Sequence, residues 1–158
     1  MPSVLLPLLL SLSLWSIDAR ADSAPSGTSR PTIGTLSRGE VGSGCGCSFF
    51  AAGKRGADAP PVLRVDADGT ATMRIDGETV TLRKTGEKLV RRGKKHPTAG
   101  DKLLMTLRGA QTQASVNASL LRSCRVADGC RQLSYRSVIA ISRNGERESI
   151  AADGLCGC

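Results

Sequence analysis

Two Cys-Gly-Cys triplets, at 45–47 and 156–158, carry the side chains of this chain that are best suited to chemistry. Cysteines form disulfides, bind metals as thiolates or exchange electrons. Side chains two apart on a strand point to the same face, so two adjacent Cys-x-Cys strands would bring four sulfurs together. Antiparallel strands would form Cys45–Cys158 and Cys47–Cys156, whereas parallel strands would form Cys45–Cys156 and Cys47–Cys158.

The chain has six cysteines, and an even number favours a disulfide framework in an exported protein. Cys124 and Cys130 flank a loop with its own turn residues, so we expect a local bridge between them. A bridge over a loop of about 100 residues stabilises by about 4–5 kcal/mol in the chain-entropy model, and a second one beside it adds little. The doubled triplet therefore has another purpose, which is strand register, edge protection or chemistry.

The chemical alternative is a metal-binding or redox protein. Four thiolates suit tetrahedral zinc or copper(I), although a one-residue spacer is less typical of zinc than Cys-x-x-Cys. That site would use Cys45, Cys47, Cys156 and Cys158. Disulfides are the favoured interpretation, and they imply no metal and no cofactor.

The N-terminus indicates export. Residues 4–14 are an apolar run that is too short to span a bilayer, and Ala19-Arg20-Ala21 has the small-x-small pattern of a cleavage site. We predict a signal peptide at 1–21 and a periplasmic or secreted mature chain without a transmembrane segment. Residues 22–43 are rich in Ser, Gly, Thr and Pro, which predicts a flexible leader before a single domain at 44–158.

Within that domain the hydrophobic period is two, which indicates strands. Asp76-Gly77 and Asn144-Gly145 are signals for two-residue hairpin turns. Through these turns Met73 would lie opposite Val80, and Ile139 opposite Ile150. Further strands are expected at 62–65, 103–107 and 113–121. The prediction is an all-β fold: a single antiparallel barrel or sandwich of about seven to nine strands, stabilised by disulfides.

The charge distribution suggests a binding function. The chain has a formal net charge of +8 and 3% aromatic residues. Its densest basic run is Arg83, Lys84, Lys88, Arg91, Arg92, Lys94 and Lys95. Such a run favours an anionic envelope polymer, a lipid headgroup or an acidic protein as partner, and its plain alternative is a solvated hairpin tip. The scarcity of aromatic residues disfavours nucleic acid, which is commonly bound by stacking.

Enzymatic activity is disfavoured. His96 is the only histidine, and it lies in the basic run, where neighbouring positive charge opposes the imidazolium. With the cysteines oxidised, a thiol nucleophile is unavailable to attack a substrate. We therefore nominate no catalytic residue.

The chain resembles short exported bacterial proteins of unassigned function. The residues that carry the resemblance are Gly44-Cys45-Gly46-Cys47-Ser48-Phe49 and the segment 154–158, Gly-Leu-Cys-Gly-Cys. That resemblance implies a periplasmic or secreted location and no particular activity. Size, export and strand content are also similar to small periplasmic lysozyme inhibitors of the β-barrel type, as an analogy of architecture alone. We expect a non-enzymatic, exported binding or structural module for an anionic envelope component or a protein, with an inhibitor among the roles that fit.

Overall fold

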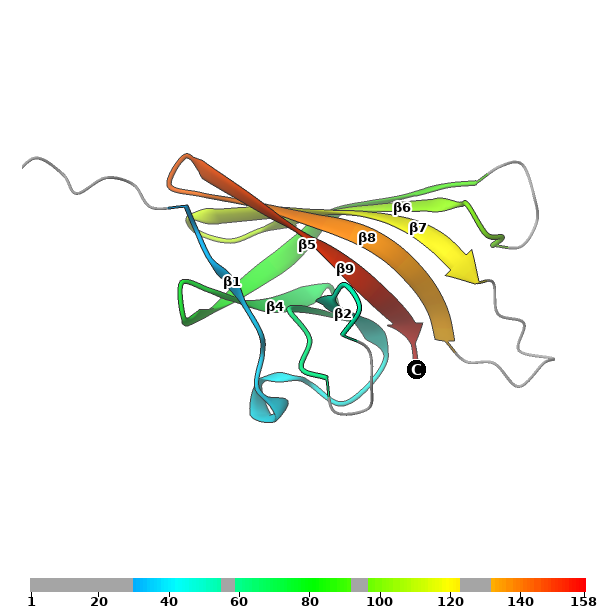
Figure 1. Ribbon diagram of the computed structural model, residues 1–158, viewed down its shortest axis with the longest axis horizontal. Coiled ribbons are helices and arrows are strands. Elements are labelled where there is room, and N and C mark those ends of the chain that lie inside the picture. Colours follow the sequence, from blue (N-terminus) through cyan, green and yellow to red (C-terminus); the bar gives the residue numbers. More distant parts are fainter. Residues whose placement is uncertain (1–29, 55–58, 92–96, 123–131) are drawn as a thin grey trace, which may run out of the picture.

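The computed structural model describes residues 30–54, 59–91, 97–122 and 132–158, and in these ranges the chain is all-β, as predicted (Figure 1). It forms nine strands and one three-residue 3₁₀ turn. In chain order these are β1 (Ile33–Gly34), η1 (Arg38–Glu40), β2 (Gly46–Ala51), β3 (Leu63–Asp66), β4 (Thr70–Ile75), β5 (Glu78–Val90), β6 (Lys102–Arg108), β7 (Thr112–Arg122), β8 (Gln132–Arg143) and β9 (Glu146–Gly157).

Eight of the strands close into an antiparallel barrel. The strand order is β1-β4-β3-β2-β9-β8-β7-β6-β5, and pairing between β4 and β5 closes the ring. The short β1 is an addition, paired to the end of β4. Figure 1 shows β6, β7 and β8 as one layer, with β4 and β2 in the layer beneath.

The two hairpins with two-residue turns, β4–β5 and β8–β9, have the predicted register. Met73 lies opposite Val80, and Ile139 lies opposite Ile150. Asp76 and Gly77 have φ angles of 54° and 81°, and Asn144 and Gly145 have 53° and 85°. Positive φ at both central positions defines the type I′ turn, whose twist matches that of paired strands.

The core follows from strict alternation along the strands. In β6 the side chains of Leu103, Met105 and Leu107 are buried, while their neighbours in sequence are exposed. Phe49 is completely buried on Gly154, where an added Cβ would lie 2.7 Å from the ring. Burial of apolar side chains of this size stabilises by about 1.5–3 kcal/mol each.

Residues 31–43 pack against the barrel, although their composition suggested a flexible leader. Leu36 is buried, and its backbone N–H donates to the Pro61 carbonyl. Glu40 accepts hydrogen bonds from Ser37 and Thr79 and pairs with Arg74 at 2.7 Å. These contacts hold the pKa of Glu40 well below its usual range, the Ser37 hydroxyl first among them. A few well-placed contacts therefore order a segment whose overall composition is polar.

The triplets form the disulfides expected for antiparallel strands, Cys45–Cys158 and Cys47–Cys156. Cys47 and Cys156 are register partners on β2 and β9, so the parallel alternative is wrong. Cys124, Cys130 and the predicted signal peptide at 1–21 lie outside the described residues. In the part of the chain that is described, no helix is long and apolar enough to cross a membrane.

The two bridges should stabilise non-additively. They span 113 and 109 residues, so either one alone closes nearly the whole domain. Removing one pair, as Cys45→Ser/Cys158→Ser, should cost about 1 kcal/mol or less of unfolding free energy, and removing both pairs about 4–5 kcal/mol. Urea unfolding without reductant measures these costs. Two equal and additive losses would contradict the chain-entropy account.

Candidate functional site

The two bridges lie together at one mouth of the barrel. Cys47 and Cys156 pack against the hydrophobic core, whereas Cys45 and Cys158 are exposed. Together with residues of β5 and β6 they line a hollow of about 280 Å³. In this arrangement the bridges seal the end of the core and fasten the first barrel strand to the last.

The sulfur cluster is oxidised in this structure. Both pairs are bonded, and metal coordination by cysteine requires thiolates, so a metal site here needs prior reduction of both bridges. Among the described residues no group of three or more His, Cys, Asp or Glu side chains is placed to hold a metal ion. The geometry fits the predicted roles of fixing register and protecting the edges of β2 and β9.

Contacts with the buried Arg64 side chain account for the residue types around the first triplet. It is 7% exposed, and its guanidinium donates to Asp66 at 2.8 Å, to the Ser48 hydroxyl at 3.1 Å and to the Gly44 carbonyl at 2.7 Å. A Cβ on Gly46 would overlap the Val65 carbonyl and lie 2.9 Å from Arg64 Nη2. The motif Gly-Cys-Gly-Cys-Ser is therefore a set of packing requirements around one buried cation.

The predicted basic run divides between two sides of the sheet. Arg83 and Lys88 point outward from β5, but a bulge between Lys84 and Gly86 interrupts the pairing with β6. Lys84 contributes to the mouth hollow and pairs there with Glu87. Arg91 is exposed just after β5. Arg92, Lys94 and Lys95 lie outside the described residues, as does His96.

The structure extends the basic surface with cations that lie far away in sequence. One cross-strand row runs Arg83–Arg108–Gln113–Ser142–Arg147, each residue being the register partner of the next. Two arginines are thus directly opposite one another on the outward side. Like charges in this arrangement destabilise a sheet.

We define the basic face as the outward side of β5–β8 together with Arg147 of β9. Its described cations are Arg83, Lys88, Lys102, Arg108, Arg122, Arg136 and Arg147. Small polar side chains lie between them, among them Ser115, Asn117 and Ser119. The acids of the described β5–β8 strands, Glu78 and Glu87, have the inward parity, so they do not neutralise the face. Among the described residues, the one acid in register with it is Asp153 of β9, which lies opposite Arg136.

Both inward acids have partners inside the barrel ends. Arg143 donates to Glu78 at 2.8 Å and to Asp76 at 3.2 Å, which raises the pKa of Arg143, with the Glu78 hydrogen bond as the largest cause. At the other end, burial raises the pKa of Tyr135, and the charge of Glu87 adds to the effect. The acids of this layer thus act on inward groups rather than on the outer cations.

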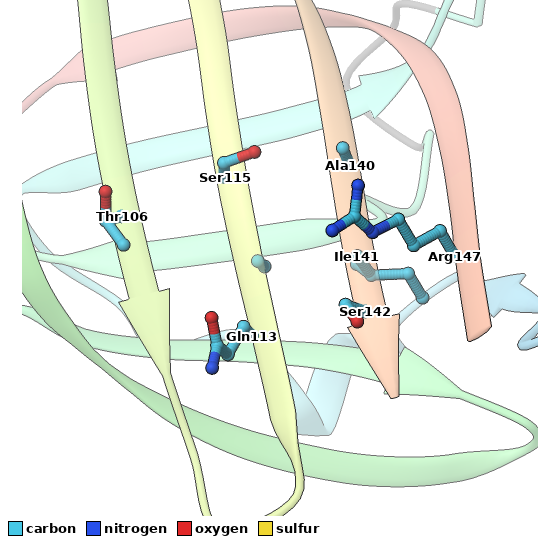
Figure 2. A pocket seen from close by; sticks show the side chains of 8 residues that line it. Thr106, Gln113, Ser115, Ala140, Ile141, Ser142 and Arg147 are labelled. Carbon is cyan, nitrogen blue, oxygen red and sulfur yellow. The ribbon is translucent and has the colours of Figure 1, made fainter. Parts of the chain in front are cut away.

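A shallow hollow marks one part of the basic face (Figure 2). It measures about 210 Å³, and both polar and apolar residues of β6–β8 line it: Thr106, Gln113, Ser115 and Ser142 with Ala114, Ala140 and Ile141. Arg147 extends over β8 toward Ala140, and its guanidinium has no hydrogen-bond or ionic partner among the described residues. An adjoining hollow of about 410 Å³ shares Gln113, Ser142 and Arg147 with it. An unpaired guanidinium beside hydroxyl and amide groups can bind a carboxylate, phosphate or sulfate.

Sequence reasoning missed Lys102, Arg108, Arg122, Arg136 and Arg147 as members of this surface, because they do not belong to the dense run. A signal was present in the alternation: Arg108 and Arg136 stand at outward positions of strands whose other parity is apolar. Their grouping on neighbouring strands, by contrast, depends on the order of the strands in the sheet, which no local pattern specifies.

Replacement of Gly46 by alanine should test the packing around Arg64. The added methyl group has no space beside the Val65 carbonyl, so we expect a loss of about 1–3 kcal/mol in unfolding free energy. Gly39→Ala is the matched control, because nothing lies within 4 Å of its Cβ position. Equal thermal melting temperatures for the two variants would refute the packing explanation.

Replacement of Arg108 by glutamate should stabilise the protein. The change turns a like-charge cross-strand pair with Arg83 into an opposite-charge pair, which is worth about 0.5–1 kcal/mol. Arg108→Gln removes only the repulsion and should gain less. Urea titration of the three proteins gives the order, and a loss of stability in both variants would show that the Arg83–Arg108 repulsion is negligible.

Comparisons with family models, with curated proteins and with solved structures found no match to this chain.

Proposed function

We propose that this chain is an exported, non-enzymatic binding module for an anionic component of the cell envelope, and that the basic face is its binding surface. The observation that carries the proposal is the composition of that face. Six cations of β5–β8 share one outward side with Arg147 of β9. These four strands place no acid on that side within the described residues, although Asp153 of β9 lies opposite Arg136. The two disulfides support export, because such bonds persist in oxidising compartments.

The opposite side of the barrel provides the contrast. There the outward cations Arg64 and Arg74 are paired with Asp66 and Glu40 and covered by residues 31–45. On the basic face, Arg108 and Arg147 form no ion pair among the described residues, Arg83 pairs with Asp68 at 3.7 Å, and Arg136 lies opposite Asp153 in the sheet register. Positive charge is therefore concentrated on one side, which strengthens attraction to an extended anion.

A charge-matched pair of variants tests this proposal. Arg83→Gln/Arg108→Gln/Arg147→Gln removes three cations of the face, and Arg30→Gln/Arg38→Gln/Lys54→Gln removes three cations outside it. With sodium polyphosphate as the probe in calorimetric titration, the first variant should bind about tenfold more weakly and with a smaller salt dependence, because exposed ion pairs each contribute up to about 1 kcal/mol.

The control variant should bind polyphosphate nearly as tightly as the unmodified protein. Equal weakening in both triple variants would reduce the effect to net charge and would refute a specific face. Absence of polyphosphate binding by the unmodified protein at low salt would also refute the proposal.

A further inference from the structure

The described chain leaves few large hydrophobic side chains exposed, and all of them lie on β5–β8. They are Leu89, Val90, Leu104, Leu121 and Val138, and Val138 is the most exposed at 49%. β1–β4 and β9 contribute none of them. An exposed cluster of this kind on one part of a surface indicates a contact site rather than the ordinary scatter of apolar residues.

Three of these side chains point outward beside cations of the basic face. Leu104 is the register partner of Lys88, and Val90 is the register partner of Lys102. Val138 lies two residues from Arg136 on the same face of β8. The set Val90, Leu104, Val138, Lys88, Lys102 and Arg136 is called the aliphatic–cation patch below.

The pairings place the patch in two adjacent rows. The first row contains Lys88, Leu104, Asn117 and Val138 in consecutive register, and the second contains Val90, Lys102, Ser119 and Arg136. Neighbouring strands are about 4.8 Å apart, so each aliphatic side chain has a cation within one or two strands. The patch therefore alternates apolar and positive groups on the scale of single side chains.

We infer that the aliphatic–cation patch docks on a bilayer surface that contains anionic phospholipids; this rests on the proposed function and assigns its ligand class. Cations at such a surface contact the phosphates, while apolar side chains beside them enter the boundary between headgroups and acyl chains. A soluble polyanion would use the cations and leave the aliphatic groups in water. Protein interfaces are enriched in aromatic residues and Met, whereas the large apolar side chains of this patch are Val and Leu.

Vesicle co-sedimentation with separate charge and aliphatic variants tests the inference on the oxidised full chain. The vesicles are phosphatidylglycerol mixed with phosphatidylcholine, against phosphatidylcholine alone, with sodium polyphosphate binding measured in parallel. Val90→Ser/Leu104→Ser/Val138→Ser should lower the partition into anionic vesicles about tenfold and leave polyphosphate binding unchanged. Lys88→Gln/Lys102→Gln/Arg136→Gln should weaken both, and an excess of inorganic phosphate should not displace the unmodified protein from vesicles.

The outcomes separate this inference from the proposed function. Polyphosphate binding without vesicle binding, or vesicle binding that the aliphatic variant retains, overturns the bilayer assignment and leaves the basic face as a site for a soluble polymer. Failure to bind either probe overturns both. Val138→Trp, made together with Trp15→Phe so that it is the only tryptophan of the chain, gives a second measurement: its emission should shift to shorter wavelength with anionic vesicles, and an unchanged spectrum contradicts docking.

Discussion

The pairing of β2 with β9 is the constraint on which the rest of the structure depends. These strands come from opposite ends of the domain, and their register, with Cys47 opposite Cys156, completes the ring of eight strands. A shift by one residue would turn Phe49 and the inner sulfurs to the outside, because side chains alternate between faces. The bridges hold the one register that buries Phe49 on Gly154. The role of the two disulfides in this structure is thus to hold the register of β2 and β9.

Barrel closure also determines the asymmetry of the surface. Residues 31–45 cross the outer side of β3 and β4, where the Gly44 carbonyl accepts a hydrogen bond from Arg64 and Glu40 accepts from Arg74 Nη2. No described segment covers β5–β8 in the same way, and the acids of those strands point inward. One polypeptide therefore has a neutralised side and a positively charged side. The difference arises from which strands residues 31–45 can reach before the chain enters β2, rather than from the total charge.

Local signals in the sequence predicted much of this fold. Asp76-Gly77 and Asn144-Gly145 specify their own turns, and alternation then assigns the inward residues. Strand pairs that are close in sequence could therefore be predicted. The triplets allowed two disulfide patterns, and only the direction of β9 relative to β2 selects between them. The packing of Leu36 and Glu40 could not be predicted from the sequence, because composition averages over a segment and does not show the contacts of single residues. Lys84 was misleading for a different reason: it follows Arg83 directly, so alternation turns it to the opposite face. The bulge between Lys84 and Gly86 then shifts the alternation, and Lys88 returns to the outward side with Arg83.

The position of the cations favours the proposed binding role over a solubility role. A solubilising charge acts wherever it is exposed, so it has no need to stand opposite another charge of the same sign. Arg83 and Arg108 are register partners, and this placement costs stability that an anion lying between the guanidinium groups would restore. A site that places like charges side by side makes the free protein less stable, and an anion bound at that site removes the repulsion. The aliphatic side chains beside Lys88 and Lys102 have the same property, because exposure to water is unfavourable for them until another apolar phase covers them.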